Sequence, residues 1–176
     1  MEFRKTAIEG IIEIFPRIFN DERGHFFESY HKTLFEKNGI PFDFVQDNQS
    51  FSTKGVLRGL HFQKAPFAQG KLVRVIKGKA IDVAVDLRPN SPTFGKYLKF
   101  LLEEEKQNMV YIPEGFAHGF MALEDCIFTY KCTNVYNKAS ESGILWNDTT
   151  LKIDWDIENP NVSTKDLELL PFQEVI

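Results

Sequence analysis

The chain has 176 residues, 43% of them hydrophobic, which is enough for one domain, residues 1–176, that buries about two-thirds of its unfolded surface. Its net charge of -4 excludes general nucleic-acid binding, because no basic tract is available to displace counterions from a phosphate backbone. No window approaches the roughly 18 apolar residues of a membrane span, and the opening MEFRKTAIEG lacks the apolar core of a signal peptide, so a cytoplasmic protein without membrane contact is expected.

Short apolar runs separated by turns rich in Gly, Pro and Asn are typical of an all-β sandwich or barrel, and phenylalanine occurs 17 times. A short helix is predicted within HKTLFEKNG (31–39), closed by Gly39, and another helix start is predicted near Ser163. In chain order, the predicted strands are 10–18, 25–31, 43–52, 56–63, 71–76, 80–87, 97–102, 109–112, 119–123 and 126–135.

GVLRGLHFQ (55–63) places Arg58 and His61 in a stretch that otherwise has the pattern of a buried strand. The two residues are three positions apart and cannot share one face of a flat strand. Gly59 between them permits a bulge that would turn both side chains towards one point. The alternative is that Arg58 lies on the surface and His61 is a core histidine with a satisfied hydrogen bond.

KLVRVIKGKAIDVAVDLRPNSP (71–92) contains the clearest pair of strands. Its two alternating runs are joined at Gly78, which predicts a β-hairpin. Alternation places Lys71 and Asp82 on faces whose other members include valine and alanine. These charged residues either point into a barrel or lie on solvated outer faces, and the pattern allows both.

IPEGFAHGF (112–120) predicts a tight turn that leads into a strand, with His118 beside a glycine where a ligand can approach closely. Two histidines on separate strands raise the question of a metal. The sequence around His61 lacks a second histidine and a carboxylate that would complete such a site, so no metal centre is predicted. Cys126 and Cys132 match neither a zinc motif nor a disulfide framework and are expected to be reduced thiols.

Eight motifs follow one another along nearly the whole chain. They are DERGHFFE (21–28), FVQDNQS (44–50), GVLRGLHFQ, AQGKLVRVIKGKAIDVAVDLRPNSPTFG (68–95), IPEGFAHGF, YKCTNVY (130–136), GILWNDTTLKIDW (143–155) and STKD (163–166). In this order they resemble the dTDP-4-dehydrorhamnose 3,5-epimerase family. The resemblance implies a cupin-type jelly-roll β-sandwich or barrel with a few short helices, a cytoplasmic homodimer, and chemistry without a cofactor.

The resemblance also implies an activity and a set of site residues. The substrate would be dTDP-4-dehydro-6-deoxy-D-glucose, inverted at C3 and C5 on the way to dTDP-L-rhamnose. His61 would be the base, Asp166 its partner, Tyr130 the acid on the opposite face of the sugar, and Lys71 the group that holds the enolate oxygen. The implied substrate contacts are Arg23, Phe26, Glu28, Gln46, Asp47, Asn48, Arg58, His118, Tyr136, Glu141 and Lys165. Among these, Tyr136 would stack on the thymine, and Arg23, Arg58 and Lys165 would form the pyrophosphate site. His25 departs from the aromatic residue that relatives commonly carry after DERG.

These residue types suit an epimerisation beside a ketone. Such a reaction needs a base and an acid on opposite sides of the ring, and a histidine with an ordinary pKa near ~6.5 is a suitable base at neutral pH. A cation at the C4 oxygen would stabilise the charge that develops there. Three alternatives stay open: an epimerase of a related dTDP-4-keto sugar that inverts only one carbon, a metal-dependent cupin enzyme, and a non-catalytic sugar-nucleotide binding module.

Overall fold

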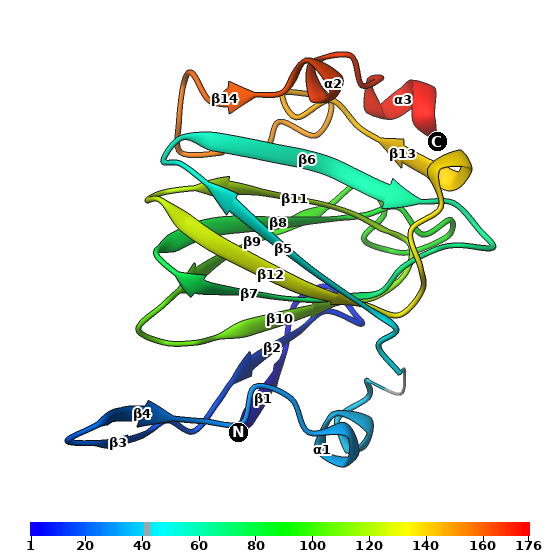
Figure 1. Cartoon of the computed structure of the whole chain (residues 1–176). Coiled ribbons are helices and arrows are strands. Elements are labelled where there is room, and N and C mark those ends of the chain that lie inside the picture. Colours follow the sequence, from blue (N-terminus) through cyan, green and yellow to red (C-terminus); the bar gives the residue numbers. More distant parts are fainter. Residues whose placement is uncertain (41–42) are drawn as a thin grey trace.

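A computed structural model describes residues 1–40 and 43–176, and two β-sheets packed against each other form its body (Figure 1). The first sheet has the strand order β1 (Glu2–Lys5), β2 (Ile12–Phe15), β10 (Met109–Ile112), β7 (Lys71–Lys77), β12 (Cys126–Cys132) and β5 (Gln46–Ser52). The second has the order β13 (Glu141–Gly143), β6 (Val56–Gln63), β11 (Phe116–Ala122), β8 (Lys79–Asp86) and β9 (Tyr97–Glu103), with β14 (Asn161–Val162) parallel to β6. The expected all-β architecture is confirmed.

The connection between β7 and β8 crosses from one sheet to the other, so the predicted β-hairpin is wrong. β7 pairs with β10 and β12, whereas β8 pairs with β9 and β11. The chain turns at Gly78, which has a positive φ of 78° and packs directly against the backbone of Asp125. Both strands have one apolar face, and these faces are buried by stacking in two sheets rather than by pairing edge to edge.

The core between the sheets decides where the charged strand residues point. Its buried members include Val73 and Val75 of β7, Ala80 and Ala84 of β8, and the stacked pair Phe120 and Phe128, whose ring centroids are 4.0 Å apart. Lys71 and Asp82 share these inward faces by strand alternation. Of the two interpretations left open by the sequence, the inward orientation is therefore the correct one for both residues.

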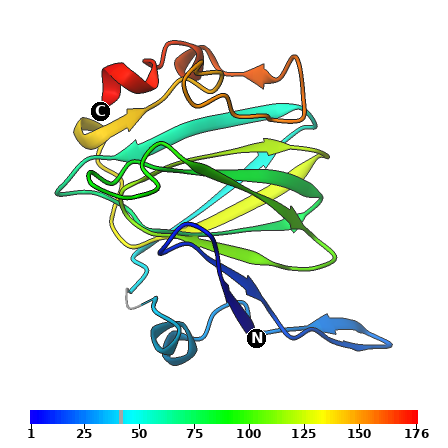
Figure 2. The same cartoon turned by 180° about the vertical axis from the view of Figure 1, so that it is seen from behind.

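Two further clusters cover the outer faces. The C-terminal segment, with α2 (Thr164–Leu167) and α3 (Phe172–Val175), lies over the second sheet and buries Trp155 and Phe172 against it (Figure 2). At the other end, Phe35 of α1 (Lys32–Lys37) packs against β2. Both predicted helices are present, since Gly39 follows α1 with a φ of 87° and the Ser163 side chain caps α2. Within the described residues, no helix is long and apolar enough to cross a membrane.

Several strand boundaries differ from the prediction. The predicted strand 25–31 is instead a hairpin of β3 (Phe19–Asp21) and β4 (Gly24–Phe26) that projects from the body (Figures 1 and 2). β2 ends before Pro16, which cannot donate to a ladder. β11 begins at Phe116, earlier than predicted, because the residues from Phe116 onward pair with β8. The short strands β1, β13 and β14, and the 3-10 helix η1 (Lys138–Ser140), were not predicted.

Candidate active site

A cavity of about 570 Å³ opens between the two sheets. Its walls come from β5, β6, β7, β11, β12 and the segment that enters α2. A recess of about 160 Å³ adjoins it, and His61, Lys71, Tyr130 and Asn48 line both. The two hollows together bring eleven predicted residues to one place: Gln46, Asn48, Arg58, His61, Lys71, His118, Tyr130, Tyr136, Glu141, Lys165 and Asp166.

A bulge in β6 turns Arg58 and His61 towards this cavity. His61 pairs with His118 and Arg58 with Phe120, so β6 holds one residue more than β11 over the same span. Gly59 occupies this bulge with a φ of 139°, and a Cβ there would lie 2.6 Å from the α-carbon of Gly119. The predicted role of Gly59 is confirmed, because only glycine permits this close crossing of the two strands.

His61 and Asp166 form a hydrogen-bonded pair. The His61 Nε2 atom lies 2.7 Å from Oδ1 of Asp166, and the other carboxylate oxygen accepts the Gly59 N–H at 3.2 Å. Burial alone would raise the pKa of Asp166, but the hydrogen bond and charge of His61, with help from Gly59 and Lys165, bring it below its usual value. An ionised Asp166 holds the proton on Nε2, so His61 keeps a lone pair on Nδ1.

Tyr130 and Lys71 lie on adjacent strands of the opposite sheet. The Lys71 Nζ atom lies 5.8 Å from the centre of the Tyr130 ring. Burial raises the pKa of the Tyr130 phenol, which therefore keeps its proton at neutral pH. Burial lowers the pKa of Lys71, an effect opposed by the neighbouring Cys132, Asp82 and Glu141. Within the described residues, no carboxylate lies in ion-pair distance of the Lys71 ammonium.

His61 and Tyr130 thus project from opposing walls. His61 comes from β6 of the second sheet, and Tyr130 comes from β12 of the first, yet both line the same two hollows. A ring held between them would present one face to an imidazole and the other to a phenol. This is the arrangement that proton transfer across a ring requires.

The mouth of the cavity carries the positive groups. Arg58 is exposed and donates to Ser52 Oγ at 3.1 Å and to the Phe51 carbonyl at 3.2 Å, two neutral acceptors that leave its charge available. Arg58 thus lies at the surface, as the alternative interpretation of this segment expects, and also lines the cavity together with His61. Lys165 donates to Glu141 at 2.7 Å, and the Tyr136 hydroxyl donates to the same carboxylate at 2.9 Å.

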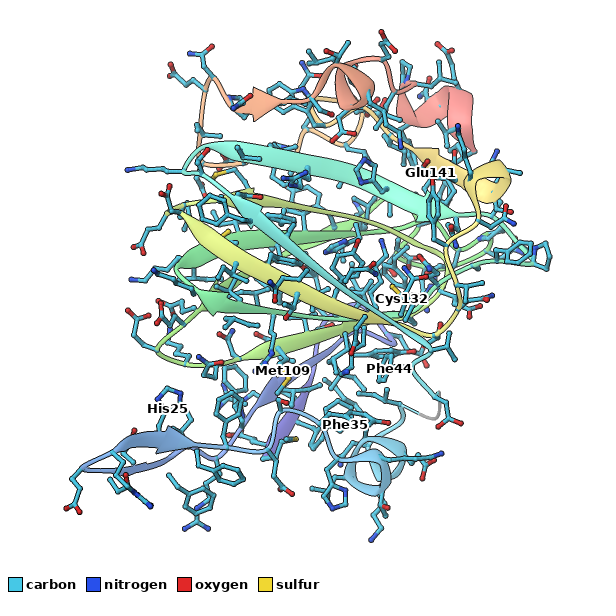
Figure 3. All side chains as sticks on the ribbon, viewed as in Figure 1. His25, Phe35, Phe44, Met109, Cys132 and Glu141 are labelled. Carbon is cyan, nitrogen blue, oxygen red and sulfur yellow. The ribbon has the colours of Figure 1, made fainter. Side chains whose placement is uncertain are left out.

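Four residues of the predicted set lie outside the cavity in the single chain. Arg23, Phe26 and Glu28 belong to or follow the projecting hairpin, where Arg23 pairs with Asp21 at 2.5 Å. Asp47 points to the other side of β5 and accepts from Lys131 at 2.8 Å. His25 is on the same hairpin, far from Glu141 and Cys132 at the cavity end (Figure 3).

Other lining residues were not predicted as site residues. Phe120 lies two positions after His118 on β11 and shares its face, so strand alternation could have identified it. Ser163 and Asn161 reach the cavity only because the C-terminal segment folds back over β6, which no local pattern indicates. Among residues 1–40 and 43–176, no group of three or more His, Cys, Asp or Glu side chains is placed to hold a metal ion.

Comparison with known proteins identifies the family to which this chain belongs. The family model described as dTDP-4-dehydrorhamnose 3,5-epimerase matches residues 5–174. The chain belongs to the dTDP-4-dehydrorhamnose 3,5-epimerase family. A relative of that name from Methanothermobacter thermautotrophicus is 50% identical over 179 residues, covering 98% of this chain and 96% of the relative.

Solved structures of the epimerase family share the fold. The enzyme from Legionella pneumophila, in complex with dTDP-4-keto-L-rhamnose, superposes with a TM-score of 0.95 at 44% identity, covering 99% of this chain and 94% of that one. A 3'-monoepimerase from Streptomyces bikiniensis, in complex with dTDP-quinovose, gives a TM-score of 0.89 at 32% identity, covering 94% and 85%. The expected cupin-type jelly roll is confirmed by these likenesses.

Proposed function

We propose that this protein inverts C3 and C5 of dTDP-4-dehydro-6-deoxy-D-glucose, giving dTDP-4-dehydro-L-rhamnose in dTDP-L-rhamnose biosynthesis. The observation that carries the proposal is the placement of His61 and Tyr130 on opposing walls of one cavity, with Lys71 between the sheets beside Tyr130. Epimerases of this family act on the same class of substrate, as the ligand of the Legionella pneumophila structure illustrates.

The reaction begins when His61 Nδ1 takes a proton from a carbon next to the C4 ketone. The electron pair of the C–H bond forms a C=C bond, and the carbonyl pair moves onto the C4 oxygen. The Lys71 ammonium donates to that oxygen and stabilises the enolate more than the ketone. Tyr130 then protonates the same carbon from the opposite face. Before the second carbon reacts, the His61 imidazolium releases its proton to solvent and the Tyr130 phenolate takes a proton from solvent.

Asp166 supports the base through the same cycle. Its ionised carboxylate fixes the Nε2–H tautomer of His61 before proton abstraction and stabilises the imidazolium afterwards. Asp166 is only 3% exposed, whereas the His61 side chain is 32% exposed, so the carboxylate end of this pair is shielded from water. Low exposure strengthens both interactions.

The nucleotide portion fits the mouth of the cavity. Arg58 and Lys165 provide positive charge for the pyrophosphate, and arginine can contact phosphate through two parallel hydrogen bonds. Tyr136 is 52% exposed beside Glu141 and offers a free ring face for the thymine. Gln46 holds this loop in place by accepting the Tyr136 N–H at 2.7 Å.

The projecting hairpin supports a homodimer. Its cross-strand pair Phe19 and Phe26 is 50% and 68% exposed, and an isolated two-stranded hairpin is marginally stable in water. A second copy that covers this hairpin would bury both rings and could receive Arg23, Phe26 and Glu28 at its own cavity. We place the one-domain dimer in the cytoplasm, where its two buried thiols would stay reduced.

The test of the proposed function is incubation with dTDP-4-dehydro-6-deoxy-D-glucose in heavy water, followed by NMR of the sugar. We expect deuterium at both C3 and C5 of the product, because each inversion exchanges one proton with solvent. Deuterium at only one carbon would identify an enzyme of the monoepimerase type. Absence of any exchange or turnover, with the nucleotide sugar bound, would favour a binding module and contradict the proposal.

A chelator arm of the same experiment addresses the metal-dependent alternative. Protein dialysed against EDTA should epimerise at the same rate as untreated protein, because the base, acid and enolate stabiliser are all side chains of this chain. Activity that is lost on dialysis and restored by a divalent metal would instead require a metal-dependent mechanism.

A further inference from the structure

Asp82 is a buried carboxylate to which the mechanism above assigns no role. It lies in the middle of β8 with 0% exposure, on the inward face that also carries Ala80 and Ala84. Its Oδ1 atom bonds His118, while Oδ2 has no hydrogen-bond partner within the described residues. Burying an ionised carboxylate with one oxygen unpaired is costly, so an uncompensated Asp82 would be unfavourable in this core.

Asp86, four residues further along the same strand, is a buried carboxylate whose oxygens both have hydrogen-bond partners. It is also 0% exposed, but its two oxygens accept from Arg88, Ser91 and Thr93 at 2.6 to 3.0 Å. That network is complete and holds the turn after β8. Incomplete pairing is therefore not a general property of buried carboxylates in this strand, and it distinguishes Asp82 from Asp86.

His118 connects Asp82 to the cavity. The His118 Nε2 atom lies 2.6 Å from Oδ1 of Asp82, and the ring lines the cavity opposite His61 in the strand register. Burial lowers the pKa of His118, with the charges of Lys71 and His61 acting in the same direction and Asp82 opposing them. A neutral ring that donates its Nε2–H to Asp82 keeps Nδ1 as an acceptor for a sugar hydroxyl.

Lys71 is the cation that Asp82 can balance. Charged or titratable groups surround it from four strands: Asp82 from β8, Cys132 and Tyr130 from β12, Glu141 from β13 and His118 from β11. Glu141 is engaged by Lys165 and Tyr136, and burial raises the pKa of Cys132, which therefore stays a neutral thiol near neutral pH. Asp82 is thus the carboxylate in this group that has an oxygen without a partner.

We propose that Asp82 is a positioning residue: from the inward face of β8 its carboxylate fixes His118 as the Nε2–H tautomer and acts as the buried counter-charge of Lys71, which lies on the inward face of the opposing sheet. This inference rests on the proposed function, because its kinetic consequence is the state of Lys71 during enolate formation. It adds a second histidine–aspartate pair to the cavity, with a role distinct from that of His61 and Asp166.

The decisive variant is Asp82→Asn, which keeps the shape of the side chain and an oxygen that can accept from His118 but removes the charge. We expect kcat to fall about tenfold or more near neutral pH with little change in KM, since the defect lies in the transition state. The alkaline limb of the kcat profile should move about one pH unit lower, because Lys71 then loses its proton more easily.

Asp86→Asn is the matched control, as it removes a buried charge from the same strand. It should lower the thermal midpoint but leave the alkaline limb where the unaltered protein has it. An unshifted limb in Asp82→Asn, or an equal shift in both variants, would overturn the inference. Normal turnover of the unaltered protein in the same assay separates this failure from a failure of the proposed function.

Two NMR measurements test the inference without turnover. In the unaltered protein, the ring nitrogens of His118 should show a protonated Nε2 and an unprotonated Nδ1, and the reverse would overturn the proposed pairing even if the variant does not fold. A titration of the Lys71 side chain should give a lower pKa in Asp82→Asn than in the unaltered protein. Equal values would remove Asp82 as the counter-charge.

Discussion

Replacement of His61 by alanine should lower kcat by about 10²–10⁴-fold while leaving affinity for the dTDP-sugar nearly unchanged. In the proposed mechanism His61 supplies the lone pair that takes the carbon-bound proton, and within residues 1–40 and 43–176 no other histidine is hydrogen-bonded to Asp166. In the proposed binding mode other residues at the mouth of the cavity hold the nucleotide, so binding should survive. Steady-state rates by NMR, with binding of dTDP by calorimetry, give both quantities.

His31→Ala is the control for this variant. His31 is exposed at the start of α1, where its ring accepts the Leu34 N–H at a long 3.4 Å, so its loss should leave turnover intact. A loss of less than tenfold in His61→Ala would show that another group removes the proton. A parallel loss of dTDP binding would show that His61 holds the substrate and does not act as the base.

Replacement of Lys71 by methionine should lower kcat by about 10²–10³-fold, the typical effect of losing one donor to a developing oxyanion. Methionine retains the length of the side chain and suits the buried surroundings of β7, so the barrel should stay folded. The substrate ketone carries little charge, and KM should therefore change much less than kcat. Initial rates over a range of substrate concentrations separate the two.

Lys77→Met provides the comparison for Lys71, because it makes the same change at the exposed far end of the same strand. It should leave kcat unaltered and lower stability slightly at most. If Lys71→Met instead raised KM at constant kcat, Lys71 would contribute equally to binding of ketone and enolate. The assignment of Lys71 to the transition state would then be wrong.

The family resemblance supplied the predicted site residues, and strand alternation grouped strand residues by face, but neither predicted strand pairing. The period of two groups Lys71 with Val73 and Val75, and Asp82 with Ala80 and Ala84, but it allows these faces to point inward or outward, and only the packing of the two sheets decides for the inward orientation. Whether a one-residue turn at Gly78 folds back within a sheet or crosses to the next depends on which faces must be buried together. The packing of the two complete sheets determines which strands pair, and no local pattern around Gly78 shows it. The predicted hairpin was therefore wrong.

Strand alternation could also have shown which residues of the set implied by the family resemblance lie on opposite faces of a strand. Gln46 and Asn48 face the cavity side of β5, while Asp47 between them points to the other face and pairs with Lys131. Arg58 illustrates a different limit, because only the register of the bulge at Gly59 sets its direction. The hairpin that carries Arg23 and Phe26 projects from the single chain, and its place in an assembly depends on a second copy.

The most direct test of the proposed mechanism compares Tyr130→Phe with His61→Ala in heavy water. If the two residues act from opposite faces of one ring, Tyr130→Phe should still exchange the C5 proton of the starting sugar for deuterium, since His61 removes and returns it on the same face, yet should form almost no epimer. His61→Ala should show neither exchange nor product. Exchange that persists in His61→Ala, or that disappears equally in both variants, would contradict the assignment of His61 as the base and Tyr130 as the acid on the opposite wall.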